Sequence, residues 1–561
     1  MNRLQIIAVG VLMSVCAYAN CETKAVMERV YEADRKADQA WDACKDIKAF
    51  NAHRAMLREK TIATIGGFPE KTPLNPKIHD TIARDGYKIE KVTFESRPGI
   101  HVTALLYLPD EAKFKPPYPG VILPCGHSRN GKGAMFYQRG CVMGAKQGLA
   151  VMIYDPFDQG ERMQKSPNGG SVHGHNTAGI KGALVGKSMA LFRVWDGIRA
   201  IDYLCSRKDI DADKIGCMGN SGGGTLTAYI TALDPRVKAS CPACYITSIR
   251  EVVEHCGPQD AEQCIFGQLS YGLNHAGLIL MSEAAVRLQI SEKDFFPIKG
   301  ALETYDVIKR VSTRLGIGER YDITVVKGPH GWKESSRTSS IDWMLKWLKN
   351  DNSIKRTQED YQKLDIDFDI KNVDAGLPDP QYNVTASGKV LDIPGERSIY
   401  DLIRDEASKA APSKKCNATL TPVEGATTLT FKTTGKGVHK FYGSKNPSDE
   451  TAVLYHLLGT SLVEVRAEKI VKAVKEEMKK TGKAPIVVAH GSWCPAVAFA
   501  YAKAPECFSG IRCVNAPLSW KEAIKGNENY NFASIVVGGL LKKDWIDYLP
   551  LNTVFEKSFT V

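Results

Sequence analysis

The chain has 561 residues, of which 43% are hydrophobic and 24% are charged, and its formal net charge is +11. This length allows two or more domains, and the composition excludes a disordered or fibrous protein. Lys and Arg form no blocks interleaved with aromatic residues, so we expect no nucleic-acid partner. The basic charge would favour an acidic polymer as a partner, although solubility explains the charge equally well.

The first 19 residues have the pattern of a secretory signal peptide. Arg3 precedes an apolar run over residues 4–15, and Ala17-Tyr18-Ala19 has the small-residue spacing of a cleavage site. The apolar run is too short to span a membrane. We therefore predict a secreted or periplasmic protein that has no membrane contact after cleavage.

The next part of the chain changes from a helical to a mixed pattern. Residues 20–75 are predicted to form an N-terminal helical arm, because residues 24–65 are charged and helical in period. Residues 76–350 are predicted to form the larger domain. Early in it, residues 120–124 are an apolar strand that is followed by a loop over residues 125–128.

The most specific signal in the chain lies at residues 215–224. A short apolar run ends in Gly219-Asn220-Ser221-Gly222-Gly223, and a helical pattern begins at Thr225. Between a strand and a helix, G-x-S-x-G is typical of a nucleophile elbow, whose sharp turn requires glycines two residues either side of the serine. We predict that Ser221 is a nucleophile; the alternative is a structural glycine-rich turn.

Two backbone N–H groups are predicted to form an oxyanion hole beside this serine. Gly222 lies at the start of the helix, where its N–H points toward a developing negative charge. The second donor is expected in the loop after an earlier strand, which assigns the N–H of His127. The His127 side chain either lines the pocket or has no role.

Two further strands each precede a candidate catalytic residue. A strand over residues 286–290 precedes Asp294, and a strand over residues 321–326 precedes His330 in a Gly/Pro turn. A helix over about residues 298–315 is predicted between the two strands. An acid and then a histidine, following the nucleophile along the chain, are typical of the α/β-hydrolases.

These residues are predicted to act as a catalytic triad. His330 would take the proton of Ser221, and Asp294 would hold the imidazole tautomer and stabilise the imidazolium. The alternatives are structural, because a turn histidine can cap the next helix and an aspartate can be an N-cap. Three glutamates are alternative acids, first Glu292 and then Glu251 and Glu254.

Several independent motifs resemble those of the acetyl xylan esterases and related carbohydrate esterases. The resemblance covers residues 121–347, with lead-in strands upstream. The motifs lie at residues 125–132, 154–162, 173–179, 194–203, 219–223, 293–297 and 328–331. Similar two-domain bacterial proteins act on plant polysaccharides, as acetyl esterases or pectin methylesterases.

The resemblance implies an α/β-hydrolase with a mostly parallel central sheet flanked by helices. It implies Ser221, Asp294 and His330 as the triad. The loops of Arg162, His173 and His175 follow strand ends on the catalytic side, so these side chains are candidates for substrate contact or, equally, for hydrogen bonds within the loops.

No residues have zinc-ligand spacing, so we expect neither a metal nor a cofactor.

The last third of the chain is predicted to be a linker and a second domain. Residues 351–383 are charged and irregular, which is typical of a linker. A faint repeat follows, because Leu184-Val-Gly-Lys-Ser188 with Arg193 recurs as Leu457-Leu-Gly-Thr-Ser461 with Arg466. Residues 384–561 are therefore interpreted as a degenerate, partial α/β-hydrolase-like domain.

This second domain is predicted to be non-catalytic. A strand over residues 484–489 leads to His490, and the elbow register places Trp493 where Ser221 stands in the first copy. No histidine follows His490, so a triad based on Ser492 has no base downstream.

The predicted function is that of a serine esterase which hydrolyses O-acetyl or methyl esters on plant polysaccharide or oligosaccharide. A prolyl-oligopeptidase-like serine peptidase shares the elbow and the residue order, but no propeller-like repeat precedes the domain. A non-catalytic carbohydrate-binding protein on a hydrolase fold is the third possibility, and the complete triad argues against it.

Overall fold

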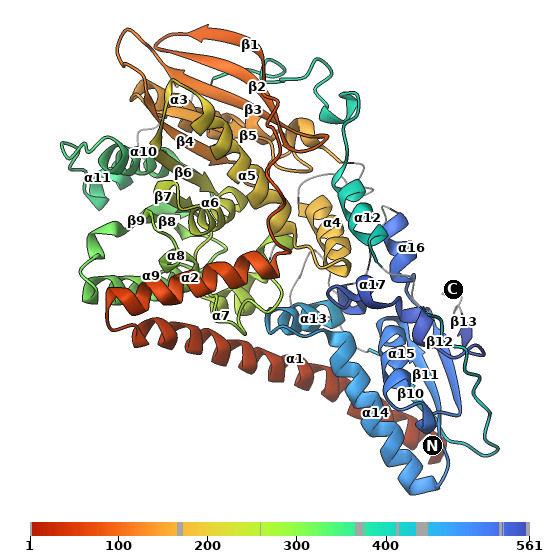
Figure 1. Ribbon diagram of the computed structural model, residues 1–561. Coiled ribbons are helices and arrows are strands. Elements are labelled where there is room, and N and C mark those ends of the chain that lie inside the picture. The colour runs from red at the N-terminus through yellow and green to blue at the C-terminus, as the bar shows by residue number, and fades with distance from the viewer. Residues whose placement is uncertain are drawn as a thin grey trace.

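The computed structural model describes residues 3–164, 172–258, 260–364, 374, 376–410, 414–433, 447–526, 530 and 532–556. For residues 3–22, 173, 447, 448 and 532 it describes the backbone only. Within these ranges the chain forms two sheets with flanking helices, and a long N-terminal helix extends from one sheet toward the other (Figure 1).

The larger sheet has nine strands within the described residues, in the order β1-β2-β3-β5-β4-β6-β7-β8-β9. The three strands β1 to β3 are antiparallel, as is the pairing of β3 with β5, whereas β4 to β9 are parallel to one another. The strands are β1 (Lys77–Arg84), β2 (Tyr87–Arg97), β3 (Ile100–Pro109), β4 (Tyr118–Pro124), β5 (Ala150–Tyr154), β6 (Ile210–Asn220), β7 (Val237–Ala243), β8 (Ala285–Lys293) and β9 (Tyr321–Pro329).

Helices cover both faces of this sheet, which explains why its central strands are apolar without alternation. In β4, Val121 and Leu123 pack with the helices of one face, whereas Ile122 packs with those of the other. On the first face lie α3 (Met135–Lys146) and α10 (Glu334–Leu348). On the second lie α5 (Met189–Ser206), α6 (Gly222–Leu233), α8 (His275–Leu280) and α9 (Ile298–Arg314).

The expected N-terminal arm is helical, but it consists of two helices that serve different parts of the molecule. These are α1 (Arg3–Ala43) and α2 (Ile47–Thr64), and Asp46 caps the second by accepting from the N–H of Ala49. Near the end of α1, Trp41 is buried in the core of the larger sheet. Earlier in α1, Val26 and Val30 are buried in the core that surrounds the second sheet. The arm therefore packs against both sheets.

The segment expected to be an irregular linker is partly ordered against the larger sheet. It contains α11 (Gln358–Lys363), which has a capping box formed by Thr357 and Asp360. Further along, Leu377 is buried and exchanges hydrogen bonds with the side chain of Gln138 in α3. Charged composition indicated a linker, but buried apolar residues at wide spacing hold this segment on the core.

The second sheet is parallel and has four strands within the described residues, in the order β10-β11-β12-β13. These are β10 (Thr428–Phe431), β11 (Ile486–His490), β12 (Gly510–Val514) and β13 (Val554–Glu556). The accompanying helices are α12 (Ile399–Ser408), α13 (Pro447–Leu457), α14 (Leu462–Thr481), α15 (Cys494–Lys503), α16 (Trp520–Lys525) and α17 (Gly539–Lys542). Of these helices, α12, α16 and α17 lie beside α4 (Val172–Leu184) in Figure 1.

The two copies of the faint sequence repeat fold alike. Gly186 and Gly459 both have positive φ, at 72° and 78°. In each copy a serine two residues later caps the next helix, Ser188 for α5 and Ser461 for α14. Each of these helices leads to a parallel strand and then to another helix, as the repeat predicts.

Among the described residues, no helix combines the length and the apolar character that crossing a membrane requires. Every cysteine whose side chain is described is a free thiol, including Cys241 and Cys244.

Candidate active site

Ser221 lies at a sharp turn between β6 and α6. Its φ and ψ are 61° and −127°, a conformation that is strained for any residue with a side chain. Two hydrogen bonds hold this turn: the Ser221 N–H donates to Ala243 O at 2.9 Å, and the Thr225 N–H donates to Ser221 O at 2.8 Å. The geometry is that of a nucleophile elbow, in which the serine side chain is lifted from the strand end.

The glycines around Ser221 are required by close backbone packing. A Cβ on Gly219 would lie 2.7 Å from Gly223 O, and one on Gly223 would lie 2.2 Å from Pro124 O. A Cβ on Gly224 would lie 2.2 Å from Ala243 O. Helix α6 begins at Gly222, three residues before the start that the sequence pattern predicted. Glycine has a poor helix propensity, but the close packing of this segment outweighs it.

The predicted acid and base lie together at the carboxyl end of the parallel strands. Asp294 follows β8 and His330 follows β9, and His330 Nδ1 is 2.8 Å from Asp294 Oδ1. The Asp294 side chain is 1% exposed and that of His330 is 23% exposed, so the pair is open on the histidine side. Because β6, β8 and β9 run parallel in one sheet, Ser221, which follows β6, lies at the same edge of the sheet as this pair.

The three alternative acids lie elsewhere. Glu292 is exposed within β8. Glu251 pairs with Lys299 at 2.8 Å, and Glu254 pairs with Arg250 at 2.9 Å. None of these three carboxylates is bonded to His330.

Cys244 connects β8 to the histidine turn. It follows β7, and its thiol lies 3.2 Å from Ser291 Oγ and 3.5 Å from Gly331 O. Burial raises the pKa of this thiol to about 12, so it stays protonated at neutral pH. Cys244 is therefore an inert buried thiol beside the histidine turn.

The loop after β4 packs directly on the elbow. A Cβ on Gly126 would lie 3.1 Å from Ser221 Cβ. The Tyr137 hydroxyl joins the two segments: it accepts from the Gly126 N–H at 2.6 Å and donates to Asn220 O at 3.1 Å. Gln159 Nε2 also donates to Gly126 O at 2.7 Å. These bonds fix the peptide that precedes His127, whose N–H is the predicted oxyanion donor.

We expect the Tyr137→Phe variant to lose about tenfold in kcat with little change in KM. The substitution leaves the buried Gly126 N–H without its acceptor, a cost of about 1–3 kcal/mol that the loop can avoid only by moving. Steady-state kinetics on a small aryl ester measure the effect. Tyr107→Phe is the matched control, because it removes a buried hydroxyl that donates to Gln138 at 2.6 Å. Equal losses in both variants would contradict the positioning role.

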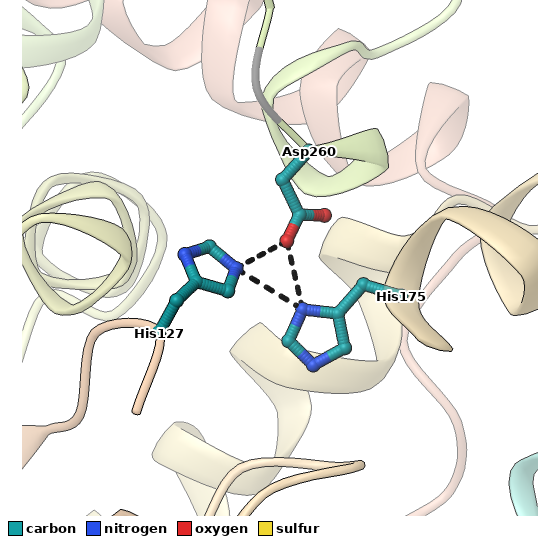
Figure 2. A group of neighbouring side chains, drawn as sticks. All are labelled: His127, His175 and Asp260. Atoms are coloured by element: carbon teal, nitrogen blue, oxygen red, sulfur yellow. Dashed lines mark hydrogen bonds and ion pairs between the residues drawn. The ribbon is translucent and has the colours of Figure 1, made fainter. Parts of the chain in front are cut away.

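Three side chains from distant segments converge beside the elbow (Figure 2). His175 Nδ1 is 2.7 Å from Asp260 Oδ2, and His127 Nε2 contacts the same oxygen. The two histidine nitrogens are 3.3 Å apart. The His127 ring lies against the elbow, because a Cβ on Gly222 would be 2.8 Å from His127 Nδ1. Burial lowers the pKa of His175 to about 4, so that ring is neutral.

A buried ion pair adjoins this cluster. Arg193 of α5 is paired with Glu262, and its Nη1 is 4.0 Å from Asp260 Oδ2. Burial raises the pKa of Glu262 to about 8, although Arg193 opposes the shift. The sequence pointed to neither residue, because Arg193 resembles any helix residue and Glu262 lies in a short 3-10 turn.

Two of the predicted substrate contacts are more deeply buried than the predicted base His330. Arg162 is buried, its guanidinium donates to Asp196 at 2.7 Å and to Asp155 O at 3.0 Å, and it covers the Phe157 ring. His175 is likewise fully buried and belongs to α4, not to a loop. Their burial argues against direct contact with a polymer. The side chain of His173 lies outside the described residues.

The comparisons with known proteins agree with this architecture. Residues 60–263 match the model of the acetyl xylan esterase family (AXE1). This part of the chain is therefore similar to the acetyl xylan esterases. The match includes Ser221, His127 and Asp260 but ends before Asp294 and His330.

A curated relative is YtaP of Bacillus subtilis (strain 168), which is described as a hydrolase. It is 26% identical over 207 residues, which cover 34% of this chain and 64% of YtaP. The chain therefore matches just under two thirds of the length of that relative.

Solved structures of similar fold include the methylesterase BT1017, with a TM-score of 0.53 and 20% identity over 68% of this chain and 80% of that one. Acetyl xylan esterase 1 from Thermoanaerobacterium sp. JW/SL YS485 has a TM-score of 0.38 and 15% identity, covering 56% of this chain and 98% of that one. The first likeness establishes the α/β-hydrolase fold of the larger sheet.

Proposed function

We propose that this protein is a secreted serine esterase that removes O-acetyl or methyl ester groups from plant cell-wall polysaccharide. The observation that carries the proposal is the strained backbone of Ser221 between β6 and α6, at the edge where Asp294 and His330 pair. Carboxylic ester hydrolysis is the chemistry of the acetyl xylan esterase family, which residues 60–263 match.

Catalysis would begin with attack of Ser221 Oγ on the ester carbonyl. His330 Nε2 takes the hydroxyl proton, since its Nδ1 side is held by Asp294. The N–H groups of Gly222 and His127 bind the oxyanion; that of Gly222 has no partner within α6, because the first N–H groups of a helix are unpaired. His330 then protonates the leaving alcohol, and water hydrolyses the acyl-enzyme.

The two candidate esters give different intermediates. With an O-acetyl sugar, the sugar hydroxyl leaves first and acetate is released by water. With a methyl uronate, methanol leaves first and the sugar acid is held on Ser221 until water releases it. The match to the acetyl xylan esterase family and the likeness to the methylesterase BT1017 support these two classes. The net charge of +11 favours the acidic polymer, pectin, to a small degree.

Product release from whole polymers tests this proposal. The full chain is incubated with acetylated xylan and with methylated pectin, and acetate and methanol are measured over time. Release of either product above the level of the Ser221→Ala variant supports a carbohydrate esterase. Cleavage of peptide substrates with no release of acetate or methanol would favour the peptidase alternative.

The Ser492→Ala variant should keep wild-type esterase turnover. Trp493 precedes α15 as Ser221 precedes α6, but its φ and ψ are −83° and −16°, an ordinary helical conformation without the strain of an elbow. Ser492 Oγ accepts from Arg466 at 2.9 Å. A fluorophosphonate label mapped by mass spectrometry should give one adduct, at Ser221, and an adduct at Ser492 would contradict a non-catalytic second domain.

A further inference from the structure

The cluster of His127, His175 and Asp260 has the composition and the setting of a metal site. The residues come from the loop after β4, from α4 and from the start of the 3-10 turn over Ala261–Gln263. They offer two imidazole nitrogens and one carboxylate oxygen, and these atoms lie within 4.8 Å of one another. Figure 2 shows the three atoms turned toward a common centre.

One ring nitrogen of His175 bonds to the backbone, and the other faces Asp260. A neutral imidazole has a single N–H, and His175 uses it at Nε2 to donate to Phe157 O at 2.5 Å. Its Nδ1 therefore carries a lone pair that faces Asp260 Oδ2 at 2.7 Å. An ion placed between the two groups would take this ring nitrogen and the carboxylate oxygen as ligands.

The surroundings are those of a prepared ligand set. The bond from His175 Nε2 to a backbone carbonyl fixes the ring with Nδ1 toward the cluster, the arrangement usual for metal-bound histidine. Asp260 is oriented as well, because its Oδ1 accepts from the Glu262 N–H at 2.9 Å. The His127 side chain is 14% exposed and the Asp260 side chain 0%, so an ion can reach the cluster past His127.

We propose that His127, His175 and Asp260 bind one divalent transition-metal ion of the zinc type. Two nitrogens on a tetrahedral zinc ion lie about 3.3 Å apart, given Zn–N bonds of about 2.0–2.1 Å. The two histidine nitrogens are already 3.3 Å apart, whereas Asp260 Oδ2, 2.7 Å from His175 Nδ1, must move away from the rings when the ion binds. Two histidines and one carboxylate leave a fourth position for water, as in other three-ligand zinc sites.

The ion joins three chain segments at the elbow. Counted from His127, His175 lies 48 residues and Asp260 lies 133 residues further along the chain. Because the His127 ring rests against Gly222, the ion fixes the loop that carries the His127 N–H. This consequence for the oxyanion hole rests on the proposed function, whereas the metal site itself does not. The inference departs from our expectation of a metal-free protein, which rested on sequence spacing.

Metal content tests the site independently of ester chemistry. The full chain is prepared without a polyhistidine tag, stripped with a chelator, incubated with Zn²⁺ and dialysed, and its zinc is measured by plasma mass spectrometry. We expect about one zinc per chain. Zinc should also raise the Tm of the stripped protein by a few degrees, since a ligand that binds only the folded state stabilises it.

Variants locate the ion within the chain. His175→Ala should reduce bound zinc to near zero, and Asp260→Asn, which keeps the side-chain size, gives the same test if the alanine variant fails to fold. His330→Ala is the matched control, because it removes a histidine from the other His/Asp group, with Cys244 and Asp294. Wild-type protein that retains no zinc would overturn the proposal. Full zinc content in both His175→Ala and Asp260→Asn would also overturn it.

Discussion

Replacing Ser221 with alanine should lower kcat by about 10³-fold or more, a loss of about 4 kcal/mol of transition-state stabilisation. Alanine cannot form the acyl-enzyme, so only the oxyanion donors and substrate binding remain. KM should change little, because the hydroxyl takes part in the reaction more than in binding. Initial rates on a nitrophenyl ester, over a range of substrate concentrations, separate the two constants.

The stability of the same variant shows whether the loss is chemical. Alanine keeps a Cβ, so the backbone at φ 61° is as strained as before, and the Ser221 hydroxyl is not part of the bonds that hold the turn. The Tm of Ser221→Ala should therefore stay close to that of the wild type. A variant that folds normally and still turns over at the wild-type rate would rule out Ser221 as the nucleophile.

The elbow could be predicted from the sequence because everything it needs is local. Five consecutive residues specify the turn, and the strand before and the helix after are visible as changes in period. The structure adds the reason for each glycine, such as the contact of a Cβ on Gly223 with Pro124 O. The positions of Asp294 and His330 could also be predicted, because each follows a strand and parallel strands bring their carboxyl ends to one edge of the sheet.

The cluster beside the elbow could not be predicted in this way. His127, His175 and Asp260 lie far apart along the chain, and each resembles an ordinary polar residue on its own. The sequence also placed His175 in a loop, whereas α4 begins at Val172. Helix α4 packs against the C-terminal part, as in the bond from the Gly538 N–H to Ala183 O at 2.8 Å. Contacts between segments that are far apart in the sequence leave no trace in the local hydrophobic periodicity.

Asp294→Asn should lower kcat by about 10³-fold while the protein remains folded. Asp294 Oδ1 accepts from both His330 Nδ1 at 2.8 Å and the Phe296 N–H at 3.1 Å. If the amide oxygen keeps that position, the imidazolium loses the carboxylate charge that stabilises it. If the amide nitrogen takes it, the nitrogen faces the Phe296 N–H and drives the histidine proton to Nε2, where it blocks proton uptake from Ser221. Either orientation therefore weakens the base.

Glu292→Gln is the matched control for this substitution. Both variants convert one acid near the end of β8 into its amide, but Glu292 is exposed and makes no bond to His330. Its kcat should stay within about twofold of the wild type, since exposed substitutions away from a site have small effects. The ratio of the two kcat values thus isolates the contact with His330 from the loss of a negative charge near the site. If Glu292→Gln proves the more damaging change, the acid is Glu292 and the observed pairing of Asp294 with His330 is structural.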